Sequence, residues 1–450
     1  MVDNNLTFTP AASGNTYTIT QIDPNTRLSR NITFPTGIND VTVMIDDINI
    51  TGNMTLRDGN DATMIINDIY MYGVITLQGD AELDLLLNGT NNVTLGIRAP
   101  EGTTLTIDSV DSTPTDPGST NGSLKIPYSS VFPAGIGGDS NENGGNITIN
   151  GGTVDVKGDN QGAGIGGGYN GNAGNIIING GMVNATGQYN GSGIGGGQNG
   201  NGGNITINGG TVNSSSWSGA GIGGGYNENG GNITINSGIV TASGPTGIGG
   251  GMNGPGGNIT IIGGTVNASG TVGAGIGSGN NSTGGNITIS GGTVNASGIS
   301  GAGIGSGANN SGGNITISGG TVTAFSGGMY YSSTGPGIGG GNNSTPLPTL
   351  DISSTADVKA YSYAHPAINV SGDNLGDGFY VNAQLNKTPS TTTDTKLKIY
   401  APADPTTPLN ELLLPANFVS FAYTTGSTVT QTDHIAAYNA SNDDYLGHVV

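Results

Sequence analysis

Apolar and polar residues alternate in short runs through the middle of the chain. The run Asn-Ile-Thr-Ile-Asn (146–150) places its two isoleucines two residues apart, and Thr-Val-Asp-Val (153–156) does the same with valines. A period of two in β-branched residues predicts a strand with one buried face. A third run, Ala-Gly-Ile-Gly (163–166), also alternates. We therefore expect three short strands, separated by Gly-rich corners.

These three runs recur along the chain. The Asn that opens the first run recurs at Asn146, Asn175, Asn204, Asn232, Asn258, Asn286 and Asn314. A fixed spacing of 26 to 29 residues indicates stacked repeats, each of which needs its neighbours to bury its apolar face. Three strands per repeat predict an all-β fold, a right-handed parallel β-helix (a solenoid), with the hand set by the crossover rule for parallel strands.

The repeats divide the chain into four predicted parts. We expect an N-terminal cap (1–37), short coils of about 20 residues (38–130), Gly-rich coils of about 28 residues (131–345) and a C-terminal β module or cap (346–450). The strands predicted outside the Gly-rich block are 42–50, 53–56, 62–69, 74–77, 82–87, 93–96, 377–384, 396–400 and 418–423.

Charge limits the chemistry of the protein. The formal net charge is −20 and the pI about 4.1, which argues against nucleic acid and anionic membranes as partners. Glu228 is the only charged residue between Asn160 and Leu350, so the repeats offer almost nothing for acid–base catalysis and we predict no catalytic residue. No apolar stretch is long enough for membrane insertion, and there are no cysteines.

Several segments carry a resemblance to known proteins. They are the runs 87–94, 97–107 and 414–422, together with the Ala-Gly-Ile-Gly-Gly and Gly-Asn-Ile-Thr-Ile-Asn-Gly-Gly-Thr-Val blocks. The chain is similar to large Gly-rich surface proteins of Gram-positive anaerobes, described as carbohydrate-binding-domain or adhesin-like proteins. The resemblance implies an extracellular or cell-surface protein and transfers no catalytic signature. The first residues do not read as a signal peptide and no wall-anchor motif is seen, so we expect any leader to lie outside this sequence.

Four aromatic residues are candidates for carbohydrate binding. Tyr189 and Trp217 hold the same place in successive repeats, and stacked coils would bring their rings about 5 Å apart, suited to the apolar face of a sugar. Tyr169 and Tyr226 share another position, directly after Gly-Ile-Gly-Gly-Gly. The alternative is that these rings cover exposed backbone at Gly-rich corners.

The outward Asn and Thr columns are a second candidate surface. Stacked amides are expected to hydrogen-bond along the coils, which is a structural role. A flat Thr array could instead bind ice or a crystalline polysaccharide, although Ile177 interrupts it. Each Asn-Ile-Thr is also a glycosylation sequon.

Calcium is the one cofactor that the sequence suggests. Asp58, Asn60 and Asp61 form an oxygen-rich turn like a calcium loop, and solvated turn residues are the alternative.

Three functions remain open at this point. The first is a non-catalytic adhesin or carbohydrate-binding surface protein whose partner is a glycan or cell-surface polysaccharide. The second is a self-associating subunit of a fibre or surface lattice. The third is a polysaccharide lyase or hydrolase, for which only Arg57 and Arg98, near Asp58 and Asp80, could form a groove.

Overall fold

The computed structural model divides the chain into two compact units. Unit 1 comprises residues 1–244 and 249–252, and unit 2 comprises 245–248 and 253–450. The residues that the structure describes are 5–7, 16–20, 27–111, 121–127, 133–327, 335–353, 355–363, 365–374, 379–384, 394–401, 404–414, 420–426, 434–439 and 445–448. The division lies inside the Gly-rich repeats.

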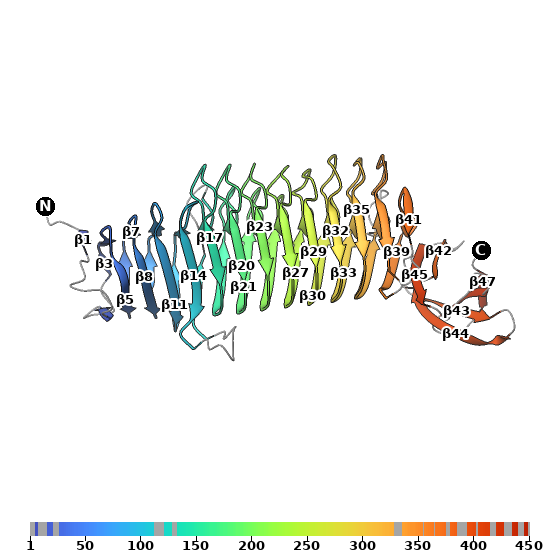
Figure 1. The fold of residues 1–450 in the computed structure, drawn as a ribbon, viewed down its shortest axis with the longest axis horizontal. Coiled ribbons are helices and arrows are strands. Elements are labelled where there is room, and N and C mark those ends of the chain that lie inside the picture. Colours follow the sequence, from blue (N-terminus) through green and yellow to red (C-terminus); the bar gives the residue numbers. More distant parts are fainter. Residues whose placement is uncertain are drawn as a thin grey trace. The chain divides into compact units, whose positions relative to one another are not determined.

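The strands of unit 1 form three parallel sheets, which we call A, B and C (Figure 1). Sheet A contains, in order, β1 (Asn5–Thr7), β4 (Asn31–Phe34), β7 (Met54–Leu56), β10 (Ile75–Leu77), β13 (Ile97–Arg98), β16 (Ile136–Gly137), β19 (Ile165–Gly166), β22 (Ile194–Gly195) and β25 (Ile222–Gly223). Sheet B contains β2 (Thr16–Thr20), β5 (Asn39–Asp46), β8 (Asp61–Asn67), β11 (Glu82–Asn88), β14 (Thr104–Ser109), β17 (Asn146–Ile149), β20 (Asn175–Ile178), β23 (Asn204–Ile207) and β26 (Asn232–Ile235). Sheet C contains β3 (Leu28–Ser29), β6 (Asn49–Thr51), β9 (Tyr70–Tyr72), β12 (Thr90–Val93), β15 (Ser123–Ile126), β18 (Thr153–Lys157), β21 (Met182–Gly187), β24 (Thr211–Ser216) and β27 (Ile239–Gly244).

Unit 2 continues the same pattern and then changes it. Its sheet A strands are β31 (Ile276–Gly277), β34 (Ile304–Gly305), β37 (Ile338–Gly339) and β40 (Ile368–Asn369), and its sheet B strands are β29 (Asn258–Ile261), β32 (Asn286–Ile289), β35 (Asn314–Ile317), β38 (Thr349–Ile352) and β41 (Gly372–Asn374). Its sheet C strands are β30 (Thr265–Gly270), β33 (Thr293–Gly298), β36 (Thr321–Ser326) and β39 (Asp357–Ser362), followed by the antiparallel β45 (Ser420–Gly426) and β42 (Phe379–Gln384). A separate antiparallel sheet has the order β44 (Asp404–Leu414), β43 (Thr395–Ala401), β46 (His434–Asn439) and β47 (Tyr445–His448). The strand β28 (Ile248–Gly249) lies at the division between the units.

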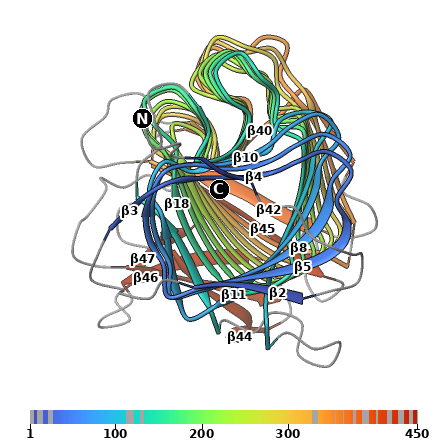
Figure 2. The same ribbon diagram turned by 90° about the vertical axis from the view of Figure 1, so that its left-hand side faces the viewer.

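The core of each coil consists of the predicted inward residues. In one coil of unit 1, Ile165, Ile176, Ile178, Val183 and Ala185 are almost completely buried. Successive coils pair residue for residue, so that each inward Ile or Val stacks on its equivalent in the next coil. Figure 2 shows the stacked coils in end view. The strands predicted in the Gly-rich coils and their parallel register are confirmed.

The short coils differ in detail from the prediction. Residues 93–96 are not a sheet A strand: Val93 pairs with Met71 in sheet C, and Ile75 pairs with Ile97. The predicted strand 42–50 is two strands, β5 and β6, because the chain turns at Asp47, which has a φ of 49°.

The predicted ends of the solenoid are also corrected. β1 and β3 pair in parallel with β4 and β6, so the region predicted as a cap (1–37) already contains coil strands. At the other end, coil strands continue past residue 345 to β41, because Pro346, Pro348 and Pro366 lie between strands and Thr349–Ile352 keeps the alternation. The predicted strands 377–384, 396–400 and 418–423 correspond to β42, β43 and β45, although 377–378 and 418–419 lie outside the described residues.

No helix among the described residues has the length and apolar character that a membrane crossing requires.

Candidate functional site

Two connections in each long coil of unit 1 fold over the outer face of sheet A. The connection from sheet A to sheet B, the A–B loop, has four residues after β10 (78–81) and eight after β19 (167–174). The connection from sheet C to sheet A, the C–A turn, grows from two residues (73–74) to seven (158–164). The early coils in Figure 2 lack the protruding loops that the later coils of unit 1 carry.

The two connections meet in a line that we call the seam. The backbone amide of Gln198, in an A–B loop, donates to the carbonyl oxygen of Gln161, in a C–A turn, at 2.7 Å. Equivalent bonds join Tyr226 to Asn190 at 2.9 Å and Met252 to Ser218 at 3.0 Å. The seam covers the glycines of the Gly-Ile-Gly strands, so that both faces of these strands are buried.

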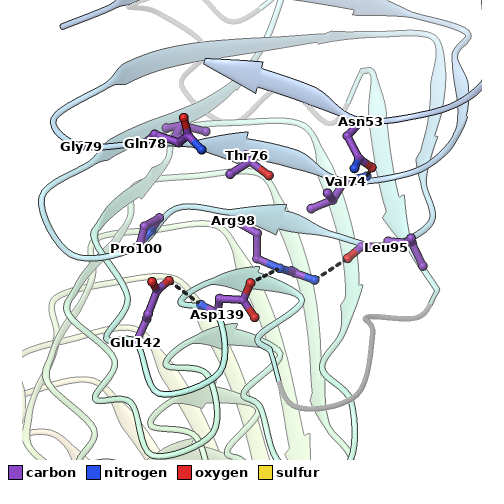
Figure 3. A pocket seen from close by; sticks show the side chains of 11 residues that line it. Asn53, Val74, Thr76, Gln78, Gly79, Leu95, Arg98, Pro100, Asp139 and Glu142 are labelled. Carbon is purple, nitrogen blue, oxygen red and sulfur yellow. Dashed lines mark hydrogen bonds and ion pairs between the residues drawn. The ribbon is translucent and has the colours of Figure 1, made fainter. Parts of the chain in front are cut away.

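A pocket of about 500 Å³ forms where the seam begins (Figure 3). Its polar lining residues are Asn53, Thr76, Gln78, Arg98, Asp139 and Glu142. Asn53, Thr76 and Arg98 come from the short coils, whereas Asp139 and Glu142 come from the first long A–B loop. The change in coil size creates this pocket, because the long loop has no equivalent over the outer face of the preceding coils.

Arg98 is the central side chain of this pocket. It pairs with Gly137 in the next coil and is only 5% exposed. Its Nη1 donates to the carbonyl oxygen of Ala134 at 2.9 Å and its Nη2 to that of Leu95 at 2.8 Å. Burial lowers the pKa of Arg98 to about 10, and the acidic side chains of Asp139 and Glu142 oppose the shift. Arg98 therefore stays positively charged, and its buried side chain fills the end of the seam.

Asp139 and Glu142 form the acidic side of the same pocket. Asp139 Oδ2 lies 3.9 Å from Arg98 Nε, and the Asp139 backbone amide donates to Glu142 Oε2 at 3.3 Å (Figure 3). Arg98 was named in the sequence-based enzyme hypothesis with Asp58 and Asp80, but the structure sets it beside these two acids instead. Aligning the repeats would have pointed to them, because the equivalent positions in the next coil are Gly168 and Gly171.

The predicted aromatic pair is present in the C–A turns of unit 1. The ring centroids of Tyr189 and Trp217 are 5.3 Å apart, as the stacking predicted, but the rings are inclined by 61°. They form an edge-to-face corner rather than a flat shelf. Trp217 is 71% exposed and Tyr189 is 50% exposed, and the Ser218 amide donates to the Tyr189 carbonyl oxygen at 2.8 Å.

The other two predicted aromatics lie in A–B loops. Tyr226 reaches the neighbourhood of the Tyr189–Trp217 corner, because its amide donates to the carbonyl oxygen of Asn190. Tyr169 holds the equivalent position two coils earlier. Both are half-buried. The seam thus brings together two positions that the sequence treated as separate.

Family comparison addresses the repeats themselves. The model described as Beta helix repeat matches residues 147–169, 176–198, 205–226, 259–280, 287–308 and 315–342. The protein is a right-handed parallel β-helix. The coil that the matches pass over lies between Asn232 and Asn258, which are only 26 residues apart. No curated protein and no solved structure matches the chain.

The outward Asn columns of the β-helix form the predicted amide ladders. Asn179 Nδ2 donates to Asn150 Oδ1, and Asn208 Nδ2 donates to Asn179 Oδ1, both at 2.7 Å. The column that starts at Asn146 is joined in the same way at Asn232–Asn204, Asn286–Asn258 and Asn314–Asn286. Ile177 interrupts the Thr column beside it.

The predicted calcium ligands do not converge. Asn60 is 2% exposed, and its Oδ1 accepts from the Ile38 amide at 2.8 Å, so it supports the backbone of the preceding coil. Asp58 Oδ1 accepts from the Asp80 amide at 3.2 Å, while Asp61 begins β8 on the exposed side. The described residues contain no group of three or more His, Cys, Asp or Glu side chains placed to hold a metal. The calcium prediction draws no support from this geometry.

Proposed function

We propose that this β-helix is a non-catalytic extracellular protein, of the adhesin or carbohydrate-binding type, that binds glycan through the corner formed by Tyr189 and Trp217. The observation that carries the proposal is the exposure of Trp217, at 71%, in direct contact with a half-exposed tyrosine. A large indole surface left in solvent costs free energy unless a ligand covers it. The resemblance to Gly-rich surface proteins supports placing this surface outside the cell.

The corner is suited to a sugar because it is rigid and amphipathic. Backbone bonds from Ser218 to Tyr189 and from Trp217 to Gln188 hold the two turns together, at 2.8 and 3.3 Å. A preformed surface loses little conformational entropy when a ligand binds. The indole face packs on the C–H face of a pyranose. The tyrosine hydroxyl and nearby amides such as Asn190 form hydrogen bonds with the hydroxyl groups of the sugar. The net charge of −20 favours neutral over anionic glycans.

A glycan array with the full chain tests the proposal. Trp217→Ala should abolish binding and Trp217→Phe should retain part of it. Ile239→Thr is a matched control, because Ile239 is another large apolar side chain, 51% exposed, and Thr occupies the equivalent position in the preceding coil. Binding that survives Trp217→Ala, or is lost equally in the control, would contradict the proposed corner.

The two alternatives have weaker support. For end-to-end assembly, the sheet C edge at β39 is already paired with β45 in an antiparallel direction, so it is closed to another copy. For a lyase, Arg98 is the best-placed base, but two of its nitrogens donate to carbonyl oxygens and its pKa stays near 10. A catalytic base should have a pKa near the working pH.

A further inference from the structure

A second hollow of the β-helix, on a different surface from Trp217, is lined mainly by asparagine side chains and glycines. It has a volume of about 440 Å³ and lies where the A–B loops enter sheet B in four successive coils, three of which supply its amides. We call it the amide groove; it is lined by Glu101, Asn143, Asn146, Asn172, Asn175, Asn201 and Asn204, and by Gly102, Gly144, Gly145, Gly174 and Gly203. Among the described residues that line it, Glu101 alone is charged.

In the first column of amides, hydrogen bonds from the backbone fix the side-chain orientation. Asn143 Oδ1 accepts from the Asn172 amide, and Asn172 Oδ1 accepts from the Asn201 amide, both at 2.8 Å. The side-chain oxygens are thereby committed and the amide orientation is set. Asn143 Nδ2 donates to Glu101 Oε2 at 2.9 Å, which also occupies the one carboxylate. Asn172 Nδ2 has no acceptor among the described residues.

The second column of amides begins at Asn146 and lacks hydrogen bonds between its side chains only at the groove. Further along the same column the amides are hydrogen-bonded to one another, and we call this part zipped. Asn232 Nδ2 donates to Asn204 Oδ1 at 2.9 Å, and Asn314 Nδ2 donates to Asn286 Oδ1 at 2.9 Å. The side chains of Asn146 and Asn175, however, make no hydrogen bond to another described residue. The ladder is thus interrupted at two of the three column residues that line the hollow, which leaves both donors and acceptors for a ligand.

We propose that the amide groove binds a neutral, extended polysaccharide that runs along the coil stack. Each coil advances the amides by about 4.8 Å, close to the length of one sugar unit in an extended chain. An amide offers a donor and an acceptor side by side, which matches the neighbouring hydroxyls of a pyranose. A groove without a free cation gives no advantage to an anionic polymer. The inference rests on the proposed glycan binding and adds a second surface with a stated ligand class.

Native affinity electrophoresis and calorimetry test this inference. The probes are soluble neutral polysaccharides (β-glucan, xylan and mannan) and their oligosaccharides of two to six units. We expect Asn172→Ala/Asn175→Ala to weaken binding by at least about tenfold, since each lost hydrogen bond contributes up to about a tenfold change. Affinity should rise with chain length up to the span of three coils and then level off.

Asn286→Ala is the matched control. It removes an amide from the zipped part of the same column, so it should lower stability and leave binding unchanged. Asn175→Ser alone should show the reverse of this control, because the Asn175 side chain makes no hydrogen bond to another described residue. The groove variant also loses the bond from the Asn201 amide to Asn172 Oδ1, so it should lower stability as well as weaken binding. If the variant does not fold, Asn175→Ser alone replaces it.

The outcomes separate this inference from the proposed function. Loss of binding in the groove variant alone supports the groove and overturns the aromatic corner. Loss in Trp217→Ala alone overturns the groove and supports the corner. Loss in both supports a ligand that uses both surfaces. A wild-type protein that binds none of the probes overturns both proposals.

Discussion

At the scale of the residue, the glycines of the Gly-Ile-Gly strands have the most demanding role. Gly195 has a φ of +138°, and a Cβ there would clash with the carbonyl oxygen of Gly223 in the next coil. Gly166 and Gly223 face the same constraint from their own neighbours. The backbone conformation disfavours any L side chain, and the spacing between coils leaves no room for one.

Gly195→Ala should therefore destabilise unit 1 by about 2–5 kcal/mol, through backbone strain and overpacking together. Gly59→Ala separates these two causes. Gly59 also has a positive φ, +69°, but nothing lies within 4 Å of its Cβ position. We expect it to cost about 1 kcal/mol. Urea unfolding measures both, and equal costs would mean that the spacing between coils leaves room for a methyl group.

Tyr361 gives unit 2 a predicted alkaline sensitivity. Burial, assisted by the carboxylate of Asp357, raises the pKa of Tyr361 to about 12. Because the folded state holds the phenol proton more tightly than the unfolded state, its contribution is complete below pH 10 and is lost as the pH rises towards 12. Between these values the wild type should lose about 2 kcal/mol relative to Tyr361→Phe. Parallel stability–pH curves for the two proteins would contradict the assignment.

At the scale of the element, amide ladders join neighbouring strands beyond their backbone bonds. Asn179 occupies the middle of one ladder and bonds to both Asn150 and Asn208 at 2.7 Å. Such ladders stabilise only one register of the strands, because a shift by one residue moves every side chain to the other face of the sheet.

Asn179→Ala should lower the stability of unit 1 by about 1–3 kcal/mol, since two hydrogen bonds are lost and the outer amides lose a partner. Asn160→Ala is the control, because Asn160 is exposed and outside the ladder. Hydrogen exchange of the amides in β17, β20 and β23 locates the effect. An equal change in the control variant would argue that the ladder adds nothing to the backbone pairing.

At the scale of the whole molecule, each coil contacts mainly the coils next to it. A whole coil can therefore be removed without disturbing the packing of the others. Deleting residues 204–231 would join Gly203 to Asn232, which is the residue equivalent to Asn204. Each strand would then meet a new neighbour of the same sheet. We expect this variant to keep its β-sheet circular dichroism and to melt within about 10 °C of the wild type.

Deleting 204–217 instead removes half a coil. The chain would then enter a C–A turn directly from an A–B loop, so sheets B and C would lose a strand from their order. We expect no cooperative melting from this variant. Equal stability of the two deletions would contradict a stack built coil by coil.

Much of this fold follows from short-range patterns. The alternation of Ile with Asn and Thr in 146–150 and the recurrence of that run specify the strands, the inward face and the parallel register, because each depends on a residue and its equivalent one coil away. The distance between Tyr189 and Trp217 follows from the same logic. Where the repeat weakens, in the short coils, prediction was wrong: 93–96 was predicted as one strand, although β12 ends at Val93 and β13 begins at Ile97.

The sequence by itself determined the coil, its period and which side chains line the interior, because these properties depend on local patterns that recur in every repeat. Only the tertiary structure decided what lies over sheet A. The seam joins Tyr226 to Asn190, and the pocket joins Arg98 to Asp139, across coils of unequal size. The open amide of Asn146 lies in the same Gly-Gly-Asn-Ile-Thr-Ile run as the hydrogen-bonded amides of Asn286 and Asn314. Such differences depend on how the loops of one coil fold against the next, which no single repeat encodes.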